Sequence, residues 1–317
     1  MNHKVAVFGE ALIDLIQQEN GDYRPFIGGS PFNVARGFVR QGLDCQYLSP
    51  VSTDHFGSQI FQSIADEGIS IPENNRSAKV TSLALVYRDE QGQPDYRLYR
   101  NDVADLDVTA AQLLAMLPPD LELFHTGSLA LVPAMEPVLI PVLEELKRRG
   151  CKISVDVNVR TGVELDHQRY VDTIWRIIDL ADIVKVSDED FSLMGLTDDP
   201  IAQSKAMLDN MDNGLVVLTL GEKGAYLIAE QTCIQQDIYR LEHFSDTVGA
   251  GDTFFSAMLA QMLREQLLKE SASEISAQHK AFSYALKFGS LAAAMNVAKV
   301  GCHPPTYEEV TSKLQQL

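Results

Sequence analysis

Residues 246–256 hold the side chains with the clearest chemical potential, and they read D-T-V-G-A-G-D-T-F-F-S. Gly249 and Gly251 permit backbone angles that other residues resist, and they leave room for a charged oxygen to reach the amides. Apolar residues recur at helical spacing in this region (Phe254, Phe255, Met258, Leu259, Met262 and Leu263). The first amides of such a helix lack partners and attract a phosphate. Asp252 is either a helix cap or a base beside this anion site, and the glycines and acids crowded into one turn favour the base.

A second loop-to-helix junction lies at residues 28–35, which read G-G-S-P-F-N-V-A. Its glycine pair permits a close approach between the backbone and a ligand. Ser30 is suited to cap the helix that follows, and Pro31 is suited to its first position. Taken alone, this segment predicts only a structural junction.

Together the two runs resemble the signatures of the ribokinase-like, PfkB-type carbohydrate kinases. The pattern D-T-x-G-A-G-D-x-F is matched from Asp246 to Phe254, and G-G-x-x-x-N-x-A is matched over residues 28–35. The resemblance implies that Asp252 is the general base that removes a proton from a sugar hydroxyl. It implies that the transferring phosphoryl group is stabilised by the amides of Gly249, Ala250 and Gly251, and that the sugar is contacted by Gly28, Gly29 and Asn33. Phosphoryl transfer depends on alignment and charge stabilisation, which fits this division of roles.

Two further residues are assigned to the sugar mainly by the resemblance. Asp14 stands where the family places an acid that accepts hydrogen bonds from sugar hydroxyls. Arg100 belongs to a run similar to the Y-R-x-x-x-A-D of bacterial fructokinases, and strand alternation places it on the opposite face from Arg97. A solvated arginine at the surface is the competing interpretation of Arg100.

The run D-V-N-V-R at residues 156–160 follows an apolar strand, and ligands of open α/β sheets bind at the carboxyl ends of strands. Alternation predicts that Asp156, Asn158 and Arg160 point to one side. Arg160 is then placed to neutralise the transferred phosphate, while Asn158 and Asp156 help to order magnesium-bound water. A structural hydrogen-bond network is the alternative.

Residues 185–190 occupy the place of the family's N-x-x-E motif, which influences magnesium and phosphate handling, but they read K-V-S-D-E-D. Ser187 replaces the asparagine and Asp190 replaces the glutamate. The resemblance assigns Lys185 and Ser187 to the nucleotide and Asp190 to Mg²⁺, with Glu189 as a compensating acid. An acidic helix start would give the same pattern through charge preference alone.

Three weaker assignments complete the site. The run T-L-G-E-K-G at residues 219–224 matches the family's T-x-G-x-x-G, so Thr219, Gly221 and Gly224 are expected along the ribose and phosphates of a nucleotide, although a hairpin turn would also explain the glycines. Asn296 lies where the family closes over adenine. Asp246 is a candidate ligand for a monovalent cation such as K⁺.

Strand-like and helix-like segments alternate along the chain, which predicts an α/β fold with a parallel sheet covered by helices on both faces. Strands are expected at residues 5–8, 46–51, 121–126, 152–157, 183–186 and 215–220, and helices at 31–41, 56–66, 134–149, 168–180, 201–211, 251–265, 275–296 and 307–317. Short strand pairs at 11–17 with 23–27, and at 81–87 with 94–100, predict a small separate sheet. The resemblance implies a ribokinase-like, Rossmann-like fold over residues 1–317 as one kinase domain. In it, segments of about 11–28 and 80–101 form a lid, and in many members two lids associate as a homodimer.

Composition limits the partners that this chain can have. Its 317 residues carry 26 Lys and Arg against 44 Asp and Glu, a net charge of −18, so the overall field repels nucleic acid and anionic membrane surfaces. Four widely spaced cysteines lack zinc or redox spacing and indicate reduced thiols. The chain opens on a strand-like run without the features of a signal peptide, and a cytoplasmic location is expected.

The phosphate loop G-x-x-x-x-G-K-[ST] is absent, and no G-x-G-x-x-G follows the first strand, which argues against P-loop kinases and dinucleotide dehydrogenases. The sequence therefore predicts a kinase that uses ATP and Mg²⁺ to phosphorylate a sugar. Fructose is the first choice, because residues 28–35 and 49–57 look most like bacterial fructokinases. The alternatives are 2-keto-3-deoxygluconate kinase, a ribose, nucleoside or aminosugar kinase, and, in a different class, a sugar-binding regulator without catalysis.

Overall fold

A computed structural model describes residues 3–88, 94–241, 243–269 and 277–317, and its larger sheet has eight strands in the order β14-β13-β12-β11-β10-β9-β1-β4. The strands are β1 (Lys4–Phe8), β4 (Asp44–Tyr47), β9 (Leu123–Gly127), β10 (Lys152–Asp156), β11 (Ile183–Ser187), β12 (Leu215–Thr219), β13 (Ala225–Ala229) and β14 (Thr232–Gln236). Strands β4, β1, β9, β10, β11 and β12 run parallel to one another, and β13 and β14 add an antiparallel edge. The predicted α/β class with a mostly parallel sheet is confirmed.

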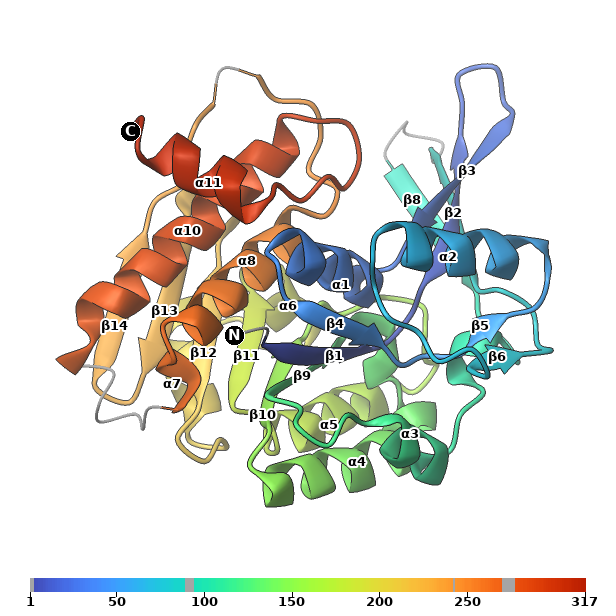
Figure 1. Ribbon diagram of the computed structural model, residues 1–317, viewed down its shortest axis with the longest axis horizontal. Coiled ribbons are helices and arrows are strands. Elements are labelled where there is room, and N and C mark those ends of the chain that lie inside the picture. Colours follow the sequence, from blue (N-terminus) through green and yellow to red (C-terminus); the bar gives the residue numbers. More distant parts are fainter. Residues whose placement is uncertain (1–2, 89–93, 242, 270–276) are drawn as a thin grey trace.

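Helices cover both faces of this sheet (Figure 1). One face packs against α1 (Ser30–Arg40), α2 (His55–Asp66), α8 (Ala250–Arg264) and α10 (His279–Val297), with α11 (Tyr307–Leu314) on α10. The other packs against α3 (Ala110–Met116), α4 (Glu136–Arg149), α5 (His167–Ile178), α6 (Asp188–Leu193) and α7 (Pro200–Leu208). Short 3₁₀ turns lie at Ala104–Leu106, Ser128–Leu131, Pro133–Met135, Gly221–Lys223 and Leu267–Lys269.

Strand alternation divides the core into two layers. In β1, Val5 and Val7 join the cluster under α1 and α8, whereas Ala6 and Phe8 join the cluster on the opposite face. Burial on both faces is what a parallel sheet requires, and it explains the nearly continuous apolar runs of these strands. The carboxyl ends of the parallel strands lie at one edge of the sheet, where an open α/β fold binds its ligands.

A second, smaller sheet has the strand order β3-β2-β7-β8 and stands to one side of the main body (Figure 1). Its strands are β2 (Leu12–Gln17), β3 (Tyr23–Gly28), β7 (Leu83–Arg88) and β8 (Pro94–Tyr99). The two predicted strand pairs are antiparallel hairpins, and β2 pairs with β7 in parallel to join them. The predicted separate sheet is confirmed.

Several elements differ from the sequence-based expectation. The strand expected at residues 46–51 divides into β4 and β5 (Val51–Ser52), the latter paired with β6 (Arg76–Ser77), because Pro50 between them lacks a backbone N–H for a ladder. Strands β13 and β14 and the short helices α3 and α6 were not predicted. The helix expected from residue 275 begins at His279, and residues 275–276 lie outside the described part. In the described part of the chain, no helix combines the length and apolar character needed to cross a membrane.

Candidate active site

The start of α8 has the free backbone donors that an anion site needs. Gly249 has a φ of 69°, and a side chain at this position would collide with Cys302. The amide of Ala250 donates to the carbonyl of Thr247 over 3.1 Å. Among the described residues, the amides of Gly249, Gly251 and Asp252 have no hydrogen-bond partner. The available donors are thus Gly249, Gly251 and Asp252, which corrects the expectation that Ala250 offers its amide.

Asp252 lies where the starts of α1 and α8 meet, and it is 8 % exposed. Its Oδ1 accepts a hydrogen bond of 2.7 Å from the Ser30 hydroxyl, and its Oδ2 accepts one of 2.9 Å from Nδ2 of Asn33. Asn33 was predicted to contact the sugar, and here it holds the candidate base. Ser30 was predicted to cap α1, but the N-cap is Gly29 and the helix has no side-chain cap. The contact between Ser30 and Asp252 joins segments 222 residues apart, so no local signal could have revealed it.

Burial raises the pKa of Asp252, because a carboxylate loses its hydration inside the protein. The hydrogen bonds from Ser30 and Asn33 and the charges of Lys185 and Arg160 act in the opposite direction. A buried acid surrounded by donors and cations has the environment of a tuned acid–base group.

Lys185 and Asp156 form a buried ion pair between neighbouring strands. They are register partners of β11 and β10, and Nζ of Lys185 lies 2.8 and 2.9 Å from the two carboxylate oxygens. Lys185 is 6 % exposed and Asp156 is fully buried. A Cβ on Gly251 would lie 3.4 Å from Nζ of Lys185, so this ammonium group stands beside the start of α8. Burial opposes the charge on Lys185, but the acids around it outweigh burial and raise its pKa.

Asp190 serves as a structural acid in this conformation. Its Oδ2 accepts hydrogen bonds from the amide and the hydroxyl of Ser187, at 2.8 and 2.7 Å, in a capping box that begins α6. Its Oδ1 accepts a bond of 2.7 Å from the amide of Val159. Glu189 is exposed. Because no three His, Cys, Asp or Glu side chains gather as a metal site in the described part, the protein forms no cage for Mg²⁺ there, and the assignment of Asp190 and Glu189 to the metal stays a prediction.

The loop after β10 turns sharply and brings Arg160 toward the base. Asn158 has a φ of 36°, so the strand-like alternation that was expected to point Asp156, Asn158 and Arg160 to one side is wrong beyond the end of β10. Arg160 lies close enough for its charge to lower the pKa of Asp14 and of Asp252. The loop therefore supplies one cation near both candidate acids.

The junction at residues 28–29 is packed against two acidic residues. A side chain at Gly28 would collide with Oδ2 of Asp14, and one at Gly29 would collide with the carbonyl of Glu10. Gly29 has a φ of 116°, which an L side chain rarely adopts. Burial raises the pKa of Asp14 to about 6, against the charge of Arg160. The structure thus brings Asp14, Gly28 and Gly29 together beside the start of α1, and their contact with a sugar stays a prediction.

Arg100 is engaged inside the protein. Its Nη2 pairs with Asp105, and its Nη1 donates to the carbonyl of Leu129 over 3.1 Å. Its side chain is only 9 % exposed. Arg100 was predicted to contact a substrate. In this conformation its guanidinium is bonded to the protein and is not open to a ligand. Glu10, which the sequence did not single out, lies within the field of Arg100, and burial raises its pKa to about 7.

The predicted nucleotide segments have structural roles of their own. Gly221 and Gly224 form the turn between the antiparallel strands β12 and β13, which is the hairpin alternative, and Gly224 has a φ of 92°. The side chain of Thr219, beside this turn, is partly buried. Asn296 is fully buried, with Nδ2 on the carbonyl of Val248 at 2.8 Å and Oδ1 on the amide of His303 at 2.6 Å. Asn296 was predicted to contact the nucleotide. In the structure its side-chain amide instead bonds to two loops and supports them.

Asp246 also connects these two loops. Its Oδ1 accepts from the amide of Val248 over 2.9 Å, and its Oδ2 accepts from the amide of Gly301 over 2.8 Å. These bonds hold residues 246–248 against the segment that supports Gly249. The role of Asp246 as a ligand for a monovalent cation stays a prediction.

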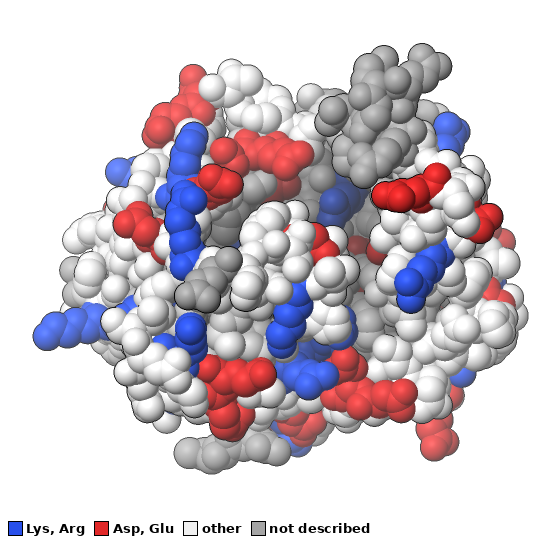
Figure 2. Space-filling view, turned by 90° about the horizontal axis from the view of Figure 1, so that it is seen from above, with Lys and Arg blue, Asp and Glu red and all other residues white. Residues whose placement is uncertain are grey.

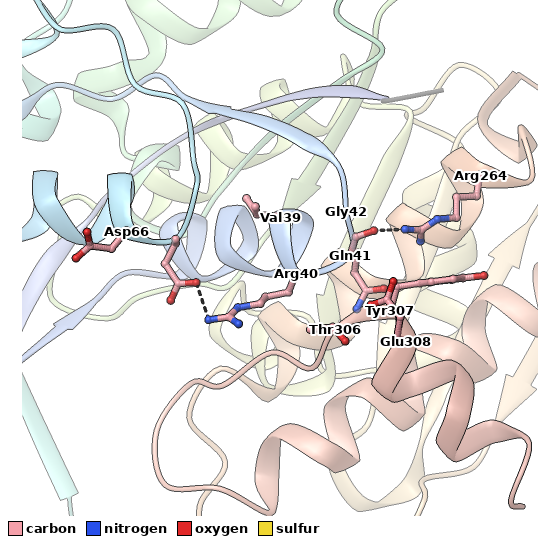
Figure 3. A pocket seen from close by; sticks show the side chains of 10 residues that line it. Val39, Arg40, Gln41, Gly42, Asp66, Arg264, Thr306, Tyr307 and Glu308 are labelled. Carbon is pink, nitrogen blue, oxygen red and sulfur yellow. Dashed lines mark hydrogen bonds and ion pairs between the residues drawn. The ribbon is translucent and has the colours of Figure 1, made fainter.

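A cavity of about 370 Å³ lies away from these residues, at the ends of α1, α2 and α8 and the start of α11 (Figure 3). Arg264 there donates to the carbonyl of Gln41 and lies over the ring of Tyr307, and Arg40 pairs with Glu67. The cavity has no glycine-rich helix start among its lining residues. On the face in Figure 2, acidic and basic side chains are interspersed, so a phosphate site must be a local feature.

The chain matches the model of the pfkB family of carbohydrate kinases over residues 2–309, and it therefore belongs to this family. It is 30% identical to the fructokinase of Rhizobium leguminosarum bv. trifolii over 264 residues, which cover 82% of this chain and 80% of that protein. It is 28% identical to the probable fructokinase-4 of Arabidopsis thaliana over 327 residues, which cover 98% and 96% of the two chains.

Solved structures share the fold over the whole chain. The ATP-bound fructokinase of Xylella fastidiosa superposes with a TM-score of 0.88 at 24% identity, covering 100% of this chain and 99% of that one. The fructokinase of Vibrio cholerae O395 bound to fructose, ADP and a calcium ion gives 0.79 at 24% identity, covering 98% of each chain. The ribokinase-like fold predicted from the sequence is confirmed.

Proposed function

We propose that this pfkB-family carbohydrate kinase transfers the γ-phosphate of ATP to a hydroxyl of fructose, with Asp252 as the general base. The observation that carries the proposal is the placement of the buried Asp252 carboxylate next to the free amides of Gly249 and Gly251. Relatives named fructokinase, at up to 30% identity, support fructose as the sugar. The Xylella and Vibrio structures named above were solved with ATP or with fructose and ADP.

In the proposed reaction, a sugar hydroxyl oxygen attacks the γ-phosphorus of ATP. Its proton passes to a carboxylate oxygen of Asp252, the new P–O bond forms, and the bond from the γ-phosphorus to the oxygen of ADP breaks. A base placed in this way contributes roughly a hundredfold to ten-thousandfold to the rate. Protonation of Asp252 is favoured by burial, which raises the pKa of this carboxyl.

Charge on the transferring group would be stabilised by fixed donors of this chain. The free amides at the start of α8 point outward, and the helix dipole adds to their attraction for an anion. The ammonium group of Lys185 stands beside Gly251, and Arg160 lies near Asp252. Donors that are in place before the reaction need no reorganisation when charge develops.

The sugar would lie between the small sheet and the carboxyl edge of the large sheet. Asp14 from β2 lies against Gly28 and would accept hydrogen bonds from the sugar hydroxyls beside the junction at residues 28–29. The small sheet would then act as the lid over the sugar. Three partly exposed aromatic residues on its strands, Tyr23, Phe26 and Tyr99, support association of two lids as a homodimer.

The proposed cofactors are ATP and Mg²⁺. ATP would place its phosphates at residues 249–252, with its ribose along the turn at residues 219–224. Mg²⁺ would enter with the nucleotide, because this ion is bound mainly through substrate phosphates and one or two carboxylates. Bound Mg²⁺ would neutralise phosphate charge. K⁺ near Asp246 and a cytoplasmic location remain predictions from the sequence.

The test is ADP release in a coupled assay with ATP and Mg²⁺, across fructose, 2-keto-3-deoxygluconate, ribose, glucose and adenosine. The Asp252→Asn variant provides the blank for ATP hydrolysis that does not depend on the base. We expect the highest kcat/KM for fructose. Preference for another compound would retain the kinase mechanism and replace the substrate, whereas sugar binding without ADP release would indicate a regulator.

A further inference from the structure

Ser30 begins α1, yet its hydroxyl contacts the candidate base instead of its own helix. The hydroxyl donates to Oδ1 of Asp252 over 2.7 Å, and Ser30 is 6 % exposed. The N-cap of α1 is Gly29, which has no side chain of its own to cap the first turn. Ser30 therefore lies at a helix start but does not cap the helix. Burying a hydroxyl costs free energy unless it forms a hydrogen bond, and here Asp252 is the partner.

The backbone of Ser30 is held by the side chain of Glu10. The amide of Ser30 donates to Oε1 of Glu10 over 3.3 Å, and Glu10, directly after β1, is 2 % exposed. A side chain at Gly29 would collide with the carbonyl of Glu10, so this close approach requires glycine. Oε2 of Glu10 has no hydrogen-bond partner among the described residues. Ser30 is thus fixed at its amide by the edge of the large sheet, and its hydroxyl is directed at Asp252.

We propose that Ser30 is a positioning residue for Asp252, with Glu10 as its anchor. The hydroxyl of Ser30 holds one carboxylate oxygen and Asn33 holds the other, so the carboxyl group cannot rotate away from the sugar hydroxyl. Ser30 transfers no proton and forms no bond to the substrate in this role. The proposal deepens the proposed function, since it rests on Asp252 as the base.

The electrostatic surroundings of Asp252 support the role. The titratable or charged groups whose fields interact with this carboxyl include Lys185 on β11, Arg160 after β10, Asp156 on β10 and the Cys302 thiol before α11. Burial raises the pKa of Asp252, and the hydrogen bond from Ser30 is the largest contribution that opposes it. Loss of the hydroxyl therefore raises this pKa further.

The kinetic test compares Ser30→Ala and Ser30→Thr with the unchanged protein. The control is Ser58→Ala, which removes an exposed hydroxyl bonded to the carbonyl of Asp54 in the first turn of α2. For Ser30→Ala we expect kcat to fall roughly tenfold to a hundredfold, as for the loss of a hydrogen bond to a charged group, with the KM for the sugar changed by less than about threefold. The acidic limb of the pH–kcat profile should move to higher pH by about one unit. Ser30→Thr keeps the hydroxyl and should restore most of the kcat, and Ser58→Ala should match the unchanged protein.

A second measurement works without turnover and separates this inference from the proposed function. Carbon-13 NMR follows the titration of the aspartate carboxyl groups, and the Asp252 signal is identified by its loss in Asp252→Asn. A higher Asp252 pKa in Ser30→Ala than in the unchanged protein supports the inference even if no sugar is phosphorylated, a result that would refute only the kinase proposal. An unchanged pKa overturns the inference. So does an unchanged kcat with a raised sugar KM, because that result assigns Ser30 to the substrate.

Discussion

Two buried charge clusters flank Asp252, and they are built in different ways. The Lys185 cluster consists of Lys185 and Asp156, which face each other as register partners on adjacent parallel strands. The Arg100 cluster consists of Arg100, Asp105 and Glu10. Arg100 and Asp105 come from the segment that follows β8, and Glu10 comes from the connection between β1 and β2. One cluster is part of the central sheet, whereas the other depends on how the small sheet is attached.

The difference separates the two halves of the proposed reaction. Lys185 stands beside Gly251, so in the proposed reaction its cluster would lie on the phosphate side of the site. Glu10 lies against Gly29, which is predicted to contact the sugar, so in the proposed reaction the Arg100 cluster would lie on the sugar side. Damage to the first cluster should therefore affect ATP, and damage to the second should affect the sugar.

The largest expected effect comes from Lys185→Met. It leaves the fully buried Asp156 without its cation, and breaking a buried pair from one side should lower the free energy of unfolding by about 4–5 kcal/mol. The ammonium group beside the phosphate site is lost as well, so kcat should fall and the KM for ATP should rise more than the KM for the sugar. Urea unfolding and initial-rate kinetics measure both. An ATP KM equal to that of the unchanged protein would place Lys185 outside the phosphate site.

Arg100→Met should have a smaller effect on stability. Asp105 and Glu10 lose their shared cation, but Glu10 can take up a proton, so we expect a loss of about 3–4 kcal/mol. The KM for the sugar should rise while the KM for ATP stays nearly constant. The same urea and kinetic measurements apply, and a rise confined to the ATP KM would contradict the division between the two clusters.

Glu10 should make stability depend on pH. Burial raises its pKa to about 7, so between pH 4.5 and 7 the folded protein keeps a proton that the unfolded chain releases. The contribution of Glu10 to the free energy of unfolding is therefore full below pH 4.5 and is lost as the pH rises through 7. The free energy of unfolding falls by at most about 3 kcal/mol over this range. Between pH 4.5 and 7, the free energy of unfolding should fall less in Glu10→Gln than in the unchanged protein. An equally steep fall in that variant would assign the titration to other groups.

Gly249→Ala should have the smallest effect on stability. Gly249 has a φ of 69°, and an alanine there should cost about 1–2 kcal/mol from backbone strain, plus the cost of moving the Cys302 side chain with which its Cβ would collide. Gly150→Ala is the matched control, because Gly150 has a φ of 75° with no atom near its Cβ position. Thermal unfolding should show a larger loss for Gly249→Ala, accompanied by reduced kcat. Equal losses and normal turnover would show that the position matters only for its backbone angle.

The sequence predicted those parts that depend on local pattern. The parallel sheet, the small sheet and the start of α8 follow from alternation, helical spacing and glycine placement, and they are confirmed. The pairing of Lys185 with Asp156 requires that β10 and β11 be neighbours in the sheet. It was not predicted, because the alternation of strands and helices along the chain does not specify which strands lie side by side.

Contacts between loops that are far apart in the sequence could not be predicted from local sequence patterns. Ser30 and Glu10 carry no signal of their roles, since each is recognised only when α1, α8 and β1 are brought together. Asn296 and Arg100 were assigned to ligands, yet tertiary packing buries both and bonds them to the protein. Asn158 departed from alternation because the strand ends two residues earlier.

The most direct test of the central claim is the turnover of Asp252→Asn with fructose, together with the affinity of this variant for fructose measured by calorimetry. The amide keeps the size of the side chain and retains a hydrogen-bond acceptor but cannot take the proton. We predict a kcat lower by roughly a hundredfold to ten-thousandfold, with fructose affinity within about threefold of the unchanged protein. A near-normal kcat in a folded variant would contradict the assignment of Asp252 as the base.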